Sequence, residues 1–107
     1  MGKIVSAEDG ANDGELDRVI HQPVRTRIMA LLCGRGTCDY STLKRTLELS
    51  DGHMTTHMRE LLASGYVEME KAFVDNKPKT TYQVTREGRK KFANYVDALK
   101  KIITGIS

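Results

Sequence analysis

The fold is decided by the stretch LSDGHMTTHMRELLASGYVEMEKAFVDNKPKTTYQVT, which runs from Leu49 to Thr85. Its first part carries apolar residues at helical spacing: Met54, Met58, Leu61 and Leu62. This spacing predicts a helix over residues 51–64, started by Ser50 or Asp51. Its second part alternates apolar and polar residues on both sides of the turn-forming segment DNKPK, which predicts a β-hairpin.

Helical patterns flank this stretch on both sides. The segment Leu16–Ile20 predicts a short helix, and Pro23 is placed in the first turn of the next one. Asp39 and Thr85 are typical N-caps of two more helices. The apolar positions of the helices that follow Pro23, Asp39 and Thr85 are, in chain order, Val24, Ile28, Leu31, Leu32; Tyr40, Leu43, Leu47; Phe92, Tyr95, Val96, Leu99, Ile102, Ile103 and Ile106. The sequence therefore predicts a mainly α fold with a small β-hairpin wing (α+β), in which a winged helix-turn-helix gains an N-terminal helix and a long C-terminal helix.

Length and composition indicate one intracellular domain. The chain has 107 residues, enough for one modest core. It has no run of apolar residues long enough for a membrane span, and its polar N-terminus lacks the apolar core of a signal peptide. Two cysteines do not make a secreted disulfide framework. We expect a cytoplasmic protein with no membrane partner, organised as a flexible arm (1–13), a winged-helix domain (14–91) and the C-terminal part of a dimerisation helix (92–107).

Positive charge is concentrated near the predicted wing. The net charge is +3 overall, but residues 71–91 hold seven lysines and arginines against two acidic residues, which is +5. The remaining residues therefore sum to −2. A local basic patch of this kind favours a polyanionic partner.

Three motifs resemble a known family. The segments HQPVRTRIMALL, LSDGHMTTHMRELLASGYVEMEK and KPKTTYQVTREGRKKF are similar to those of compact winged-helix transcriptional regulators related to the MarR and ArsR groups. The resemblance covers roughly residues 16–99. It implies a dimeric DNA-binding repressor or activator whose helix 51–64 enters the major groove, and it names no effector.

The residues themselves indicate how double-stranded DNA would be bound. On a helical wheel, Thr56 lies opposite the apolar side of helix 51–64, with Arg59 beside it, so small and hydrogen-bonding groups face outward. Lysines at the hairpin tip, stiffened by Pro78, would place the wing (74–79) on the phosphate backbone or in the minor groove. We interpret Arg25 and Arg27 as solvated helix surface. The candidate DNA-binding residues are Lys44, Arg45, His53, Thr55, Thr56, Arg59, Lys77 and Lys79.

The last helix carries a seam that predicts a homodimer. Its apolar positions follow a coiled-coil-like spacing, and a domain of this size does not offer enough surface to cover all of them. A two-fold dimer would place two recognition helices about 34 Å apart, one turn of the duplex. The candidate interface residues are Leu16, Val19, Ile20, Tyr95, Leu99, Ile102, Ile103 and Ile106.

Three other functions were weighed against DNA binding. A protein-interaction module within a larger complex would carry apolar residues where Thr56 and Arg59 stand. A metal- or redox-responsive ArsR-like sensor would use the pair His53 and His57 or the cysteines, but no compact set of four ligands is evident. An enzyme would need a nucleotide-binding loop, a carboxylate pair or a nucleophile motif, which the sequence lacks. We therefore expect no catalysis, no metal and no cofactor.

Overall fold

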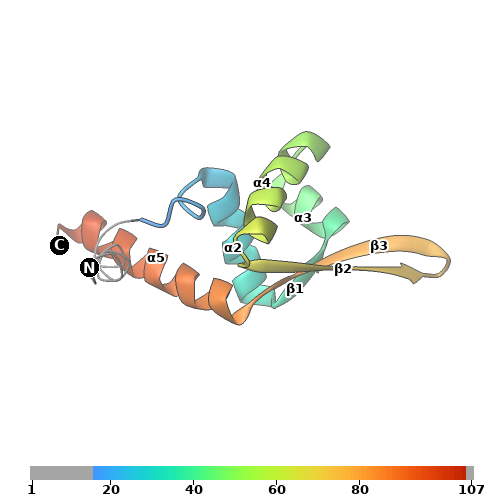
Figure 1. Ribbon diagram of the computed structural model, residues 1–107. Helices are drawn as coiled ribbons and strands as arrows, with labels where there is room; N and C mark the ends of the chain where they lie inside the picture. Colours follow the sequence, from blue (N-terminus) through green and yellow to red (C-terminus); the bar gives the residue numbers. More distant parts are fainter. Residues whose placement is uncertain (1–15, 106–107) are drawn as a thin grey trace.

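The computed structural model describes residues 16–105 of the chain. In chain order the elements are α2 (Pro23–Arg35), β1 (Thr37–Asp39), α3 (Tyr40–Leu47), α4 (Asp51–Ala63), β2 (Val67–Val74), β3 (Lys77–Val84) and α5 (Arg86–Thr104). Figure 1 shows the hairpin β2–β3 projecting from one end of the body and α5 leaving at the other. The arrangement is the α+β winged-helix fold that the sequence predicts.

Each helix from α2 to α5 begins at a side chain that accepts a hydrogen bond from a backbone N–H three residues on. Such a cap satisfies a donor that has no partner within the helix. The capping pairs are Gln22 with Arg25 N, Asp39 with Thr42 N, Ser50 with His53 N and Thr85 with Gly88 N. The predicted caps Asp39 and Thr85 are thus confirmed, and Ser50 rather than Asp51 caps α4.

The sheet has the strand order β1-β3-β2, and both pairings are antiparallel. Its hairpin turn is only two residues long, Asp75 and Asn76, with φ of 54° and 64°. Two left-handed residues make the turn that suits the twist of a hairpin. The predicted turn DNKPK was therefore too long, because Lys77 already opens β3. Pro78 is tolerated within that strand since β1 pairs only with residues 81–83 and leaves this edge of β3 open.

The core lies between α4, the other helices and the end of the sheet that is nearest the helices. α4 contributes Met54, Met58 and Leu61, which are at most 2% exposed. Burying such a side chain stabilises the fold by about 1.5–3 kcal/mol. The other buried apolar side chains are Ile20, Ile28, Met29, Leu32, Cys38, Leu43, Leu49, Tyr66, Val67, Tyr82, Val84, Tyr95 and Ala98.

The N-terminal part of the described chain differs from the prediction. Residues 18–20 form a turn and not the expected short helix, and the Asp17 carboxylate caps this turn by accepting hydrogen bonds from Val19 N (2.8 Å) and Ile20 N (3.1 Å). The hydroxyl of Tyr66 donates to the same carboxylate at 2.6 Å and anchors the turn to the end of α4. Together with burial, this bond raises the pKa of Tyr66 above its ordinary value.

The short strand β1 was not expected from the sequence. Its three residues pair with β3, more than forty positions further along the chain, so no local pattern reports it. β1 widens the wing into a three-stranded sheet and places Asp39 at the start of α3.

The last helix, α5, runs without a break from Arg86 to Thr104, past the expected domain boundary at residues 91–92. Over residues 16–105, no helix, including the lysine-bearing α5, combines the length and the apolarity that a bilayer crossing needs.

Gly88 gives a direct test of how α5 packs on the body. A Cβ at this position would overlap the backbone carbonyl oxygen of Tyr66, and backbone cannot move aside as a side chain can. We expect Gly88→Ala to lower the free energy of unfolding by about 3 kcal/mol, the upper end for overpacking. Gly34→Ala is the matched control, because nothing lies within 4 Å of its Cβ. It should raise stability by up to about 1 kcal/mol in the same urea titration. Equal effects of the two substitutions would contradict this packing.

Candidate nucleic-acid interface

The outer side of α4 is polar and uncovered. Because the apolar residues of α4 point into the core, the residues a half-turn away face solvent. Thr56 and Arg59, the two residues that the sequence analysis placed at the centre of the interface, are both exposed. The other exposed residues of the helix are Asp51, Gly52, His53, Thr55, Glu60 and Ala63.

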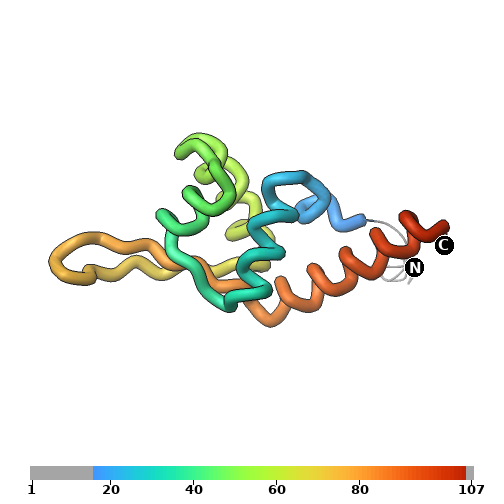
Figure 2. The backbone as a smooth tube through the Cα atoms, turned by 180° about the vertical axis from the view of Figure 1, so that it is seen from behind, coloured from blue at the N-terminus to red at the C-terminus, as the bar shows by residue number. Residues whose placement is uncertain are grey.

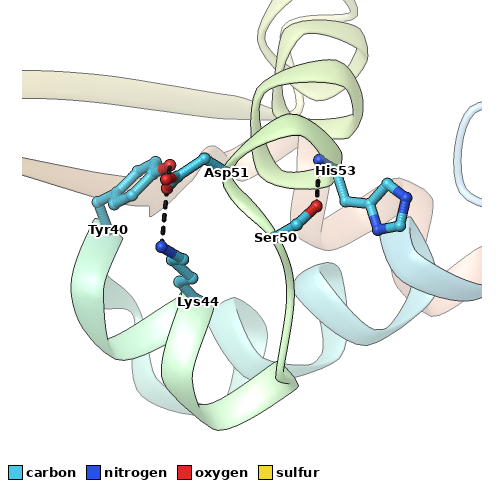
Figure 3. A network of polar contacts seen from close by, with 5 residues as sticks. All are labelled: Tyr40, Lys44, Ser50, Asp51 and His53. Carbon is cyan, nitrogen blue, oxygen red and sulfur yellow. Dashed lines mark hydrogen bonds and ion pairs between the residues drawn. The ribbon is translucent and has the colours of Figure 1, made fainter.

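The first residue of α4 is held by α3. The Asp51 carboxylate accepts a hydrogen bond from the Tyr40 hydroxyl at 2.6 Å and pairs with Lys44 Nζ at 2.9 Å. Figure 3 shows this cluster beside the Ser50 cap. The bond from Tyr40, followed by that from Lys44, lowers the pKa of Asp51, and the same carboxylate raises the pKa of Tyr40 to about 12. A carboxylate at a helix N-terminus also suits the helix dipole. The cluster fixes where α4 begins relative to α3.

α4 is also tied to α2, through Arg25. The guanidinium Nη1 lies 3.0 Å from Nδ1 of His57, and Nε donates to the carbonyl of Val19 at 2.5 Å. A guanidinium only donates, so His57 accepts through Nδ1 and is neutral, with its proton on Nε2. Burial, followed by the charge of Arg25, lowers the pKa of His57. Arg25 is therefore a structural link, whereas the sequence analysis interpreted it as solvated surface.

Arg27 also has a structural role. Its Nη2 donates to the carbonyl of Leu47 at 2.7 Å, at the C-terminal end of α3. A cation is favourable there because the last carbonyls of a helix lack intrahelical partners. The pair Arg25 and Arg27 thus connects α2 with both helices of the helix-turn-helix, a role that only the structure reveals.

A groove separates α4 from the sheet. It has a volume of about 510 Å³, and Arg59 and Thr55 lie on one wall with Tyr82 of β3 on the other. A second hollow of about 460 Å³ lies between α3 and the wing and is lined by Lys77, Lys79 and Ser41, among others. Tyr40 lines both hollows. The two hollows therefore join the exposed side of α4 to the wing as one surface, named here the α4–wing surface.

The lysines of the wing lie in β3 and not at the tip of the turn. Lys79 Nζ is 3.8 Å from a carboxylate oxygen of Asp39, an ion pair that is loose and partly exposed. Asp39 is held mainly by Thr42, whose hydrogen bonds lower the pKa of that carboxyl. Such surface pairs contribute at most about 1 kcal/mol, so Lys79 can exchange its partner at little cost.

The structure brings most of the predicted DNA-binding residues onto one side. Thr55, Arg59, Lys77 and Lys79 line the α4–wing surface, with His53 and Thr56 exposed on the adjoining side of α4. Lys44 is partly engaged by Asp51, and Arg45 is exposed on α3. Sequence reasoning missed Tyr40 and Tyr82, because an aromatic at an apolar position predicts core and not the wall of a groove.

The residues considered for metal or redox sensing do not form a site in the described part of the chain. The rings of His53 and His57 lie with centroids 6.4 Å apart, and within residues 16–105 no three histidine, cysteine or acidic side chains gather as metal ligands. Cys33 and Cys38 are free thiols. Burial raises the pKa of the Cys33 thiol, which keeps it protonated and slow to react.

Two residues expected at a dimer interface lie inside the protomer. Ile20 is 0% and Tyr95 5% exposed, because the N-terminal turn and α5 cover one another. His21 Nδ1 lies 3.0 Å from the Tyr95 hydroxyl in this contact. Both residues are therefore removed from the candidate interface. Leu16, Val19 and Leu99 are half-buried, Ile102 and Ile103 are exposed, and Ile106 is outside the described residues.

The geometry defines a class: a winged helix-turn-helix in which α3 and α4 form the helix pair and β2–β3 the wing. Residues 24–103 match the family described as the winged helix DNA-binding domain. The chain belongs to this family.

Relatives and solved structures agree with this assignment. An uncharacterized protein of Methanocaldococcus jannaschii is 35% identical over 79 residues, covering 74% of this chain and 86% of the relative. A transcriptional regulator homologue from Pyrococcus horikoshii OT3 superposes with a TM-score of 0.79 at 29% identity, covering 83% of this chain and 88% of that one. YusO of Bacillus subtilis, at 16% identity and a TM-score of 0.67 over 94% of this chain and 73% of its own, shares the fold. The winged-helix domain predicted from the sequence is thereby confirmed.

The bond between Arg25 and His57 predicts a stability that depends on pH. His57 has a folded-state pKa below its ordinary value of 6.5, so the unfolded chain takes up this proton first as the pH falls. The contribution of His57 is fully present above about pH 6.5 and is lost as the pH falls through the lower, folded-state value. Thermal melts should therefore show a larger fall in Tm on acidification for the wild type than for His57→Gln, whose amide oxygen accepts from Arg25 without titrating.

His53→Gln is the control for this experiment, since it leaves the bond between Arg25 and His57 in place. It should stay much closer to the wild type than His57→Gln does, because the charge of His53 ranks behind burial and Arg25 among the causes that lower the pKa of His57. If His57→Gln shows the same fall in Tm as the wild type, the assignment of His57 as a neutral hydrogen-bond acceptor is wrong.

Proposed function

We propose that the protein is a sequence-specific, dimeric DNA-binding transcriptional regulator that acts as a repressor in the cytoplasm. One observation carries this proposal: α4 turns an uncovered polar side, with Thr56 and Arg59, toward the same region as a lysine-bearing wing. The family assignment supports it independently. Binding, and not catalysis, is the activity that this surface suits.

α4 is the proposed recognition helix. The major groove is about 12 Å wide and admits one helix, provided that the inserted side carries no bulky apolar group. Arg59 can donate two hydrogen bonds to guanine, and Thr55 and Thr56 can contact base edges or thymine methyl groups. Glu60, on the same side, would disfavour phosphate and accept from cytosine. These groups would supply the sequence preference.

The wing and α3 are the proposed phosphate contacts. Lys77 and Lys79 would each displace a counterion from the backbone, which gives affinity without sequence information. Lys44 and Arg45 would approach the backbone beside α4. The loose pair between Lys79 and Asp39 favours this role, because a phosphate can replace the carboxylate partner.

The exposed seam of α5 is the proposed dimer contact. Ile103 is 74% and Ile102 50% exposed, on a helix end that extends past the other helices in Figure 2. A two-fold axis at this helix would bring two α4 helices about 34 Å apart, so that they meet successive major grooves. Two copies together would bind a promoter tightly enough to exclude polymerase, which is the proposed mode of repression.

Substitutions distinguish the contribution of the recognition helix to DNA binding from that of the wing. Arg59→Ala should lose about 1–3 kcal/mol of discrimination at one base position of a duplex selected from a random pool, with little change in affinity for random DNA. Lys77→Ala and Lys79→Ala should weaken binding to all sequences and flatten the slope of log K against log salt by about one unit each. Fluorescence anisotropy over a salt series measures both effects.

Lys100→Ala, exposed on α5 and outside the basic segment 71–91, is the matched control and should leave affinity and slope unchanged. An equal loss on all sequences for Arg59→Ala would reduce this residue to a backbone contact. A wild-type chain that binds no duplex above background would refute the proposed function.

The dimer is tested by placing a charge on the seam. Ile103→Glu should convert the dimer to monomer in sedimentation velocity without unfolding it, because the side chain is already exposed in the protomer. Ala93→Glu introduces the same charge at an exposed position of α5 that is not part of the apolar seam, and it should remain dimeric. A dimer that persists in Ile103→Glu would place the contact elsewhere.

A further inference from the structure

The wing carries an apolar surface that the rest of the subunit leaves uncovered. β2 and β3 have eight residues each, but β2 is buried only at Val67. Further out, Met69 is 45% and Phe73 77% exposed. Figure 2 shows the outer half of the hairpin standing clear of all the helices. Over residues 16–105, nothing packs over most of this phenyl ring.

The strand register places this apolar surface on a defined face. Cross-strand partners and alternate residues share a face of a sheet. Val67 pairs with Val84, Met69 with Tyr82, and Phe73 with Pro78. Because Val67, Tyr82 and Val84 are buried, this is the face that packs on the core. Phe73 and Pro78 lie at its outer end, beyond the reach of the helices.

Lysines lie on both faces of the hairpin that carries the exposed ring. Lys71 lies on the same face, one pair inward, opposite Thr80, and Lys77 and Lys79 lie on the other face of the hairpin. Over residues 71–79 three lysines stand against one carboxylate, that of Asp75. An exposed aromatic ring on a hairpin with lysines on both faces suits a partner with anionic walls and an aromatic interior. The minor groove of DNA has this chemistry, with phosphates along both edges and stacked bases within.

We propose that Phe73, backed by Pro78, is an apolar wedge that enters the DNA minor groove, unstacks a base step and bends the duplex. This inference rests on the proposed DNA-binding function. Apolar side chains inserted in this way kink DNA by about 20–90° toward the major groove. Sequences that contain an easily unstacked pyrimidine–purine step would then be favoured where the wing lands, although no base edge is read there.

The α4–wing surface allows Phe73 to enter the minor groove while α4 lies in the adjacent major groove. Arg59 and Tyr82 face each other across the first hollow, and Pro78 lines the second hollow beside Tyr40. A duplex lying along this surface reaches Phe73 at its end. The bend in turn would bring more backbone toward the wing lysines, which offsets the cost of unstacking.

The experiment measures DNA bending at saturating protein. A short duplex selected from a random pool by the wild-type chain carries a donor dye at one end and an acceptor dye at the other, so that bending raises the energy transfer. Phe73→Ala should lose more than half of the rise seen with the wild type. Phe73→Leu keeps an apolar wedge and should retain most of it. Glu70→Gln is the control, because Glu70 is exposed on the opposite face of the hairpin and lines neither hollow, and it should bend like the wild type.

The outcomes separate this inference from the function on which it rests. An unchanged rise in energy transfer for Phe73→Ala at full occupancy would overturn the wedge and leave DNA binding intact. Loss of self-association of the free protein in Phe73→Ala, with bending retained, would also overturn it by making the ring a protein contact. Failure of the wild-type chain to bind any duplex would overturn the wedge and the proposed function together.

Discussion

The burial of one side of α4 is the constraint on which the rest of the structure depends. Met54, Met58 and Leu61 are locked in the core, so the helix cannot rotate about its axis without exposing them. Its opposite side, with Thr56 and Arg59, is therefore held outward by packing and not by any contact of its own. A surface fixed in this way is pre-organised for a partner, which lowers the entropy cost of binding.

Hydrogen bonds set the position of this helix along its axis and connect it with the rest of the subunit. Asp51 is held by Tyr40 and Lys44 at the N-terminal end, and Arg25 joins His57 to the carbonyl of Val19. The adjoining turn contacts α5 through the pair of His21 and Tyr95. The proposed dimer helix and the proposed recognition helix are thus physically connected through the N-terminal turn, although they lie on different sides of the core.

The sequence predicts the helices well because local chemistry determines them. Apolar spacing, Pro23 and the caps at Asp39 and Thr85 each act within a few residues, and the α+β winged-helix fold follows from their order. The failures have a non-local cause. β1 exists only because β3 pairs with it, and the turn at residues 18–20 is held on the body by the hydrogen bond from Tyr66 to Asp17. No sequence pattern within five residues of β1 or of Asp17 predicts either contact.

The candidate site also divides into residues that local sequence patterns predict and residues that only the structure places. Thr55, Thr56 and Arg59 follow from the period of α4, since whichever side lies opposite the core is exposed. The interface residues were harder to predict, because the same apolar spacing serves the protomer core and a partner surface. Ile20 and Tyr95 proved to be core, whereas Ile102 and Ile103 stay exposed past the end of the body. The wing was also interpreted from composition alone, so its lysines were placed at the turn instead of in β3.

The central claim is that a duplex lies along the α4–wing surface. Amide chemical shifts of isotope-labelled protein, recorded during titration with a selected duplex, test it most directly because every backbone N–H reports separately. The account predicts saturable changes concentrated in residues 51–60 and 71–80, with the second half of α5 unchanged. Changes confined to α5, or no saturable change in α4, would contradict it.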